Sequence, residues 1–197
     1  MTVIQWQSDL IDTQSFLVSR GKRFERGLSV EELQCAEQKC GTTFPPDLRW
    51  FLSQWLPVGG YFADWRRLPA YLDEQIGWPL EGILFDVTEN KYWRAEWGSR
   101  PDVQSDAVRI ATQHIRAAPP LIPIVEHCYL PSNPPEVGNP VFSVYQTDII
   151  HAGPNLAGAL RWLFRENADP LDDDNPVYSE AYTYAPFWTD LARENYE

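Results

Sequence analysis

Residues 121–164 read LIPIVEHCYLPSNPPEVGNPVFSVYQTDIIHAGPNLAGALRWLF, and this stretch decides the fold class. Three short apolar runs, LIPIV, VFSVY and DIIHA, are typical of strands, and a helical repeat of Leu and Ala follows Asn155, a suitable helix cap. The second and third runs predict an antiparallel hairpin that turns at Gln146 and Thr147. Pro123 has no amide proton to donate, so the first run is expected either at a sheet edge or with this position facing away from the ladder of hydrogen bonds. Strands followed by a helix indicate an α+β domain.

Three helices are predicted upstream of this stretch. Apolar residues repeat at helical spacing between residues 2 and 20 and again between residues 44 and 55. Between these two segments, Ser29 and Glu32 have the spacing of a capping box, which marks the start of a helix. Gly41 can adopt the left-handed conformation that ends such a helix. The first third of the chain is therefore expected to be helical.

The middle of the chain is predicted to be extended and then helical. Residues 61–68, 82–87 and 91–97 are rich in β-branched and aromatic residues and are interrupted by Gly and Asn, a pattern that favours strands. Residues 101–118 place apolar side chains on one helical face and have Asp102 as a candidate cap. This region therefore predicts several short strands followed by one helix.

Composition and motifs indicate an ordinary globular protein. The chain has 197 residues, 44% of them hydrophobic, which suits a single domain. It contains no apolar run long enough to span a membrane, and its acidic N-terminal stretch does not resemble a signal peptide, so we expect a cytoplasmic monomer without membrane insertion. The three Cys and three His residues lie far apart or in spacings that do not suit ligands, so neither a disulfide framework nor a metal site is expected. No cofactor-binding motif is present, and we expect no cofactor.

The acidic residues are concentrated near the end of the chain. The net charge is −12, and residues 166–197 contain nine Asp or Glu residues but only one Arg. Such a charge repels nucleic acid and anionic lipid, and it would speed the encounter with a basic protein. The alternative is a solvated tail that only aids solubility. We therefore expect the partner to be a protein, and the acidic charge favours a basic one. Binding of nucleic acid is not expected.

The segments LSVEELQCAEQKCGTTFPPDLRWFLSQWLPVGG (28–60), LIPI (121–124), VFSVYQTDIIHAG (141–153) and NLAGALRWLF (155–164) together resemble the SUKH superfamily of Smi/Knr-type proteins. The resemblance rests on the order and spacing of these parts. It implies an α+β fold in which a twisted, largely antiparallel sheet is flanked by helices. Bacterial members are immunity proteins that bind and neutralise toxins, and other members are regulatory or scaffold modules. The family has no shared catalytic residues that could be transferred to this chain.

The resemblance suggests one domain that spans residues 1–197. Its common core would cover residues 28–165, preceded by a helix within 1–27 and followed by an acidic extension, 166–197, packed on the body. Two segments depart from the family pattern, namely the extension and the tract 127–140, which contains four prolines. Both would lie outside the common core. Variable additions often carry the specificity of a binding protein, although these could instead cover an exposed strand.

Seven residues are candidates for contact with a partner. They combine aromatic rings, which dominate binding energies when exposed, with acidic or imidazole groups in the two variable segments. The aromatic members could equally fill the core, which is the common fate of such rings. The candidates are Trp65, Glu126, His127, Tyr129, Asp172, Asp173 and Asp174.

Catalysis has one candidate cluster, Glu126, His127 and Cys128, which places a carboxylate, an imidazole and a thiol in succession. Adjacent strand residues point to opposite faces, so His127 and Cys128 are not expected to share a hydrogen bond. The sequence therefore favours a non-catalytic binding domain, specifically an immunity protein that neutralises a toxin. A regulatory or scaffold module is the alternative, and a cryptic hydrolase is a third possibility.

Overall fold

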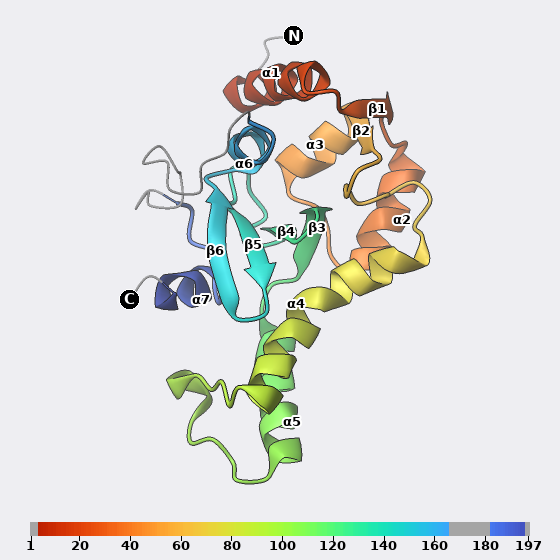
Figure 1. The fold of residues 1–197 in the computed structure, drawn as a ribbon. Coiled ribbons are helices and arrows are strands. Elements are labelled where there is room, and N and C mark those ends of the chain that lie inside the picture. The colour runs from red at the N-terminus through yellow and green to blue at the C-terminus, as the bar shows by residue number, and fades with distance from the viewer. Residues whose placement is uncertain (1–3, 166–181, 196–197) are drawn as a thin grey trace.

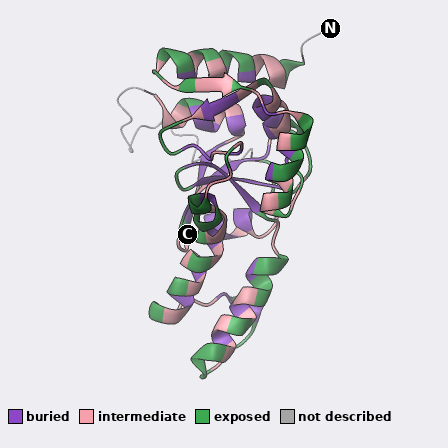
Figure 2. Cartoon of the chain, turned by 90° about the vertical axis from the view of Figure 1, so that its right-hand side faces the viewer, coloured by how far each residue is buried: buried purple, intermediate pink, exposed green. Residues whose placement is uncertain are grey.

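The computed structural model describes residues 4–165 and 182–195, and it has the predicted α+β architecture (Figure 1). The helices in these residues are α1 (Gln5–Ser19), α2 (Val30–Cys40), α3 (Pro46–Gln54), α4 (Ala70–Glu89), α5 (Gln104–Ala117), α6 (Leu156–Leu163) and α7 (Trp188–Glu194), with a 3₁₀ turn, η1 (Ala95–Trp97). The strands are β1 (Arg23–Arg26), β2 (Trp55–Val58), β3 (Leu121–Val125), β4 (Cys128–Pro131), β5 (Val141–Tyr145) and β6 (Asp148–Gly153). Figure 2 shows buried residues filling the sheet and exposed residues along the outer faces of the helices.

Both sheets are antiparallel. Strands β1 and β2 form a ribbon, and the larger sheet has the order β3-β4-β5-β6. The hairpin at Gln146 is confirmed, and so is the edge position of β3 with its Pro123. The free edge of β3 is covered by a loop, because the amide of Glu126 donates to the carbonyl of Tyr61 (2.9 Å) and the amide of Ala63 donates to that of Ile124 (3.2 Å). This loop and the β3–β4 turn are thereby held side by side.

The tract 127–140 begins with a strand of the larger sheet. Strand β4 lies between β3 and β5, and all four of its residues are buried. The tract is held further along by Asn139, whose amide donates to the carbonyls of Pro131 (3.0 Å) and Pro134 (2.7 Å). The prediction that His127 and Cys128 are strand residues is correct for Cys128, which begins β4, whereas His127 lies in the turn before it.

The helices with clear end signals form as predicted. Ser29 and Glu32 make the reciprocal bonds of a capping box at the start of α2, and Gly41 ends that helix at φ +69°. The side chain of Asn155 accepts from the amide of Gly158 (2.8 Å) and caps α6. Helix α5 is also confirmed, but its N-cap residue is Val103 and not Asp102. These helices rely on bonds within one turn, which sequence spacing can identify.

The prediction of a strand at 82–87 is wrong, because this segment belongs to the 20-residue helix α4. The helix contains Pro79, which has no amide proton for the carbonyl of Gln75 four residues earlier. The hydroxyl of Tyr129 in β4 donates to that carbonyl instead (2.8 Å). A side chain from the sheet thus replaces the helical hydrogen bond that proline removes, and Figure 1 shows α4 changing direction as it leaves the body.

The predicted strands at 61–68 and 91–97 are also wrong. The first segment makes only the single bridge of Phe62 to Val125, followed by turns, and the second contains the 3₁₀ turn η1. Their aromatic residues serve as packing groups, because Trp65 and Trp97 are both buried. Aromatic enrichment therefore signalled burial here and not strand structure.

Helix α4 approaches the β5–β6 turn very closely. A Cβ atom at Gly82 would lie 3.0 Å from the Cα atom of Gln146, so glycine permits this approach. The carboxylate of Asp86 then accepts from both the amide (2.9 Å) and the hydroxyl (2.6 Å) of Thr147. Asp86 is buried, and these bonds compensate for its loss of water. The turn and the helix are consequently fixed to each other.

The end of the described chain closes over the sheet. Helix α7 packs against β6, and the indole of Trp188 donates to the carbonyl of Pro119 (2.7 Å). The guanidinium of Arg94, itself buried, donates to the carboxylate of Glu194 (2.9 Å from Nε). The side-chain amide of Asn195 donates to the backbone carbonyls of Thr147 (2.9 Å) and Ile149 (3.0 Å). Residues 182–195, part of the acidic extension, therefore pack on the body.

Replacing Tyr129 by Phe should lower the free energy of unfolding by about 1–3 kcal/mol, because the carbonyl of Gln75 loses its donor. In a Pro79→Ala background the same change should cost less, because alanine restores the helical amide. A double-mutant cycle by urea denaturation measures the coupling. Equal costs in the two backgrounds would show that the hydroxyl does not compensate for the proline.

Acid should destabilise the fold through His151. Burial lowers the pKa of His151 to about 4, with a further contribution from the charge of Arg193, and its ring stacks on Tyr182 at 4.3 Å. Because the folded state disfavours the protonated form, the stability contributed by the neutral ring is present above pH 6.5 and is lost as the pH falls toward 4. The loss should reach about 2 kcal/mol at pH 5.

Urea denaturation between pH 7 and 4.5 measures this effect, with His151→Phe as the control that keeps an aromatic ring but cannot titrate. The difference in stability between the wild type and the variant should change in this pH range. A constant difference would rule out His151 as the source.

Candidate functional site

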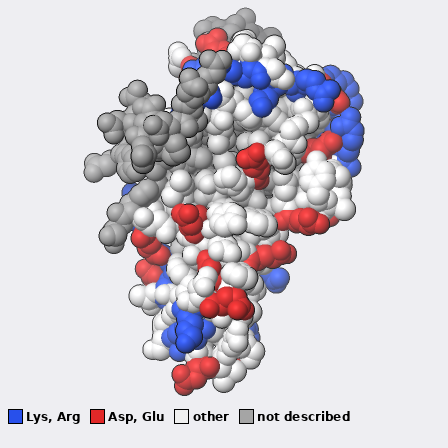
Figure 3. Space-filling model, in the orientation of Figure 1, with Lys and Arg blue, Asp and Glu red and all other residues white. Residues whose placement is uncertain are grey.

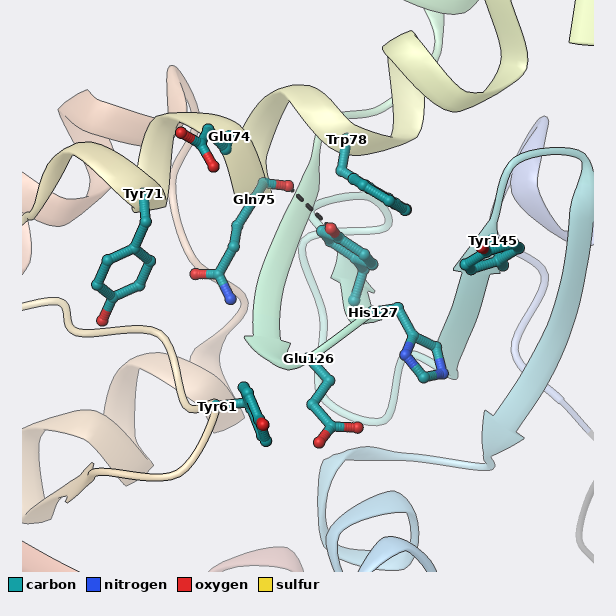
Figure 4. Close-up of a pocket in the computed structure, with 9 residues that line it drawn as sticks. Tyr61, Tyr71, Glu74, Gln75, Trp78, Glu126, His127 and Tyr145 are labelled. Atoms are coloured by element: carbon teal, nitrogen blue, oxygen red, sulfur yellow. Dashed lines mark hydrogen bonds between the residues drawn. The ribbon is translucent and has the colours of Figure 1, made fainter. Parts of the chain in front are cut away.

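A hollow of about 610 Å³ lies beneath the first half of α4 (Figure 4). Its walls come from α4, the β3–β4 turn, the end of β5 and the loop before residue 62. We call it the aromatic groove. It is lined by Tyr61, Tyr71, Glu74, Gln75, Trp78, Glu126, His127, Tyr129 and Tyr145.

One face of α4 supplies four of these side chains. Tyr71, Glu74, Gln75 and Trp78 follow the i, i+3, i+4, i+7 spacing that places residues on one side of a helix. Figure 4 shows the side chain of Gln75 reaching from the helix toward the hollow. The groove thus depends on α4 being helical across Pro79, since Trp78 lies next to the proline.

Four rings of the groove are exposed. The exposed fractions are 69% for Tyr61, 46% for Tyr71, 41% for Trp78 and 57% for Tyr145. The indole of Trp78 donates to the carbonyl of Val144 (3.2 Å), and its ring centroid lies 6.0 Å from that of Tyr145. Trp78 is therefore held in position while part of its ring faces solvent.

The β3–β4 turn supplies the polar side of the groove. Glu126 adopts a left-handed conformation at φ +51°, and the carbonyl of His127 accepts from the amide of Val144 (2.9 Å). Both side chains of the turn are exposed. The carboxylates of Glu126 and Glu74 are the charged groups here, and the lining residues, all within the described chain, include neither Lys nor Arg. The groove therefore combines aromatic rings with negative charge.

Tyr129 forms the floor of the groove and has a structural role there. Its side chain is buried, and its hydroxyl is engaged by the carbonyl of Gln75. Burial raises the pKa of the phenol, so it stays protonated and remains a donor at all physiological pH values.

The structure brings three of the seven candidate residues together, namely Glu126, His127 and Tyr129. Trp65 does not join them. It is 2% exposed and packs against Phe44 in the core, with 5.2 Å between ring centroids, so it presents no surface to a partner. The acidic candidates lie outside the described residues: Asp172, Asp173 and Asp174.

Six groove residues were not identified from the sequence. They are Tyr61, Tyr71, Glu74, Gln75, Trp78 and Tyr145. A helical periodicity from Tyr71 to Trp78 was the available signal. It was obscured by the Gly and Pro residues that follow in the same segment.

Glu126, His127 and Cys128, the cluster that was considered for catalysis from the sequence and disfavoured, do not form a site with a reactive thiol. Cys128 begins β4, points into the core and is 1% exposed. Burial raises its pKa to about 12, with Glu126 contributing in the same direction, so the thiolate is strongly disfavoured at neutral pH. His127 belongs to the turn and its side chain is exposed. The two residues therefore do not provide an activated nucleophile.

Residues 4–165 and 182–195 contain neither a cluster of metal ligands nor a helix that could span a membrane. No group of three His, Cys, Asp or Glu side chains in this part of the chain is placed to hold a metal ion. None of its helices combines the length and apolar character needed to cross a membrane.

No protein-family model, no curated protein and no solved structure matches this chain.

Thiol reactivity should distinguish the three cysteines. Cys35 is exposed, whereas burial raises the pKa values of Cys40 and Cys128 to about 12. Labelling of the folded protein with a disulfide reagent at pH 8 should modify one thiol quickly, and Cys35→Ser should abolish this phase. Cys128→Ser should leave it unchanged. Rapid labelling of Cys128 would instead support a thiol nucleophile.

Proposed function

We propose that this protein is a stoichiometric binding domain that masks a partner protein, and that it acts as an immunity protein of the SUKH type. The observation that carries the binding proposal is the aromatic groove, with its four exposed rings and two carboxylates. The specific role as an immunity protein rests on the resemblance of residues 28–165 to that superfamily.

The groove has the character of a protein contact surface. Trp and Tyr are the residues that most often dominate binding energy at interfaces, and here they lie together. The bond of Trp78 to Val144 and that of Tyr129 to Gln75 hold the walls in place before a partner arrives. Side chains that are already ordered lose less entropy on binding, which supports a high affinity for the area covered.

The charge of the groove supports a basic partner. Glu74 and Glu126 make the groove negative, and the chain as a whole has a net charge of −12. Complementary charge raises association rates and excludes partners of the wrong sign. A basic toxin domain is a partner of this kind. Hydrolysis receives no comparable support, because the thiol of Cys128 is buried and protonated.

Co-expression with toxin domains encoded beside the gene tests this function, with growth as the readout. The wild type should restore growth, and Trp78→Ala should reduce the affinity for the toxin by at least about tenfold. Phe85→Ala is the matched control, because Phe85 is also exposed on α4 and does not line the groove. It should protect as the wild type does.

Two results would contradict the proposal in different ways. Rescue that survives Trp78→Ala with unchanged affinity would move the contact surface away from the groove. Failure of every neighbouring toxin to be neutralised would reject the immunity role and favour a regulatory or scaffold module.

A further inference from the structure

A second hollow, of about 310 Å³, continues from the aromatic groove. The two share Tyr61 and Glu126 as lining residues, so they meet at the covered edge of β3. Its other walls include Lys22, Arg23 and the ring of Phe164, with glycines that leave the space between them free of side chains. The combined groove is negative at the α4 end and positive at the β1 end. Figure 3 shows the same separation, with Lys and Arg along the upper edge of this face and Asp and Glu across its middle.

The charged side chains of this groove differ from their neighbours on the body in their ion pairing. Among the described residues, Lys22, Arg23, Glu74 and Glu126 form no ion pair. Their neighbours on the body differ, because Arg66 pairs with Glu25 (2.6 Å) and with Glu32 (2.9 Å). Arg67 likewise pairs with Asp64 at 2.9 Å. The charges that line the groove are therefore placed where a bound ligand could pair with them.

The aromatic end also has an unused acceptor. The side-chain Oε1 of Gln75 has no hydrogen-bond partner in the described structure, although it is shielded from solvent. An unsatisfied buried acceptor is costly, so a donor that reaches it is favoured. In Figure 4 the side chain of Gln75 reaches from α4 into the space between Tyr71 and Tyr61, and Glu126 lies across the hollow from it.

We propose that the groove binds an extended segment of the partner that carries an Arg or Lys side chain and, a few residues away, an acidic side chain. The cation lies among the aromatic rings beside Glu126 and Gln75, and the acidic group lies between Lys22 and Arg23. This inference rests on the proposed binding function and specifies the chemistry of its ligand.

Each end of the groove suits its group for a physical reason. An Arg or Lys cation is attracted to the faces of Tyr and Trp rings, and a guanidinium can also donate to a carboxylate and an amide oxygen. At the other end, Lys22 lies over the ring of Phe164 at 4.2 Å, which orders its ammonium group. Arg23 is exposed and can form the second contact with a carboxylate. Opposite charges along one groove also fix the direction of the bound segment.

Short capped peptides provide the test. The probes are acetyl-Ala-Arg-Ala-Ala-Glu-Ala-amide, the peptide with Arg and Glu exchanged, and two peptides in which Gln replaces either charged residue. Titration of ¹⁵N-labelled protein follows the indole N–H signal of Trp78, assigned by its loss in Trp78→Phe. One of the two doubly charged peptides should bind about tenfold more tightly than the other and than both singly charged peptides.

Charge-removing variants locate the two ends. Glu126→Gln should weaken every Arg-containing peptide by about three- to tenfold, and Arg23→Gln should weaken only peptides that contain Glu. Glu81→Gln on α4 and Arg116→Gln on α5 are matched controls outside the groove, and they should have no effect.

Three results would overturn the inference. They are an absence of any Trp78 shift up to about 5 mM peptide, affinities that ignore charge, and an unchanged affinity in Glu126→Gln. The charge specificity and the proposed function can fail separately. If neutralisation of the toxin requires Trp78 but tolerates Glu126→Gln and Arg23→Gln, the groove remains the binding surface and its charge specificity is rejected.

Discussion

The hydrogen bond from the hydroxyl of Tyr129 to the carbonyl of Gln75 supports much of this structure. Proline at position 79 removes the amide that would normally satisfy this carbonyl, and an unsatisfied group there would favour breaking the helix. The sheet supplies the donor, so α4 continues to Glu89 and carries its aromatic face over the β3–β4 turn. This contact joins distant parts of the chain at the floor of the groove, and the bonds of Asp86 to Thr147 and of Trp78 to Val144 hold the same helix against the β5–β6 hairpin.

The sequence predicted those elements whose determinants are local. The capping box of α2, the cap of α6 and the β5–β6 hairpin each depend on residues within a few positions of one another. Helix α4 could not be predicted in the same way, because Pro79 and Gly82 read as breaks unless Tyr129 and the β5–β6 turn are known to be nearby. The error at 82–87 and the omission of four groove residues therefore have a single cause. Tertiary contacts outweighed local propensity.

The residues of the candidate site also divide into those that the sequence could identify and those that only the tertiary structure brings together. Glu126, His127 and Tyr129 could be singled out because they are consecutive or nearly so in a variable tract, and they do meet at the groove. Tyr61 and Tyr145 come from segments more than 80 residues apart, and only the pairing of β3 with its neighbours brings them to one surface. The net charge of the chain likewise did not locate the groove. The groove places Glu74 and Glu126 toward α4 and Lys22 and Arg23 toward β1, an arrangement that no count of acidic and basic residues can reveal.

The dependence of α4 on a phenol in β4 also constrains how this protein can diverge. A change of Tyr129 to a residue without a hydroxyl is tolerated more readily where position 79 is no longer proline, and a proline is acquired more readily where the tyrosine is already present. The two positions, 50 residues apart in sequence, should therefore vary together among descendants of this chain. The side chain of Tyr61 is 69% exposed, so the fold should constrain its identity less.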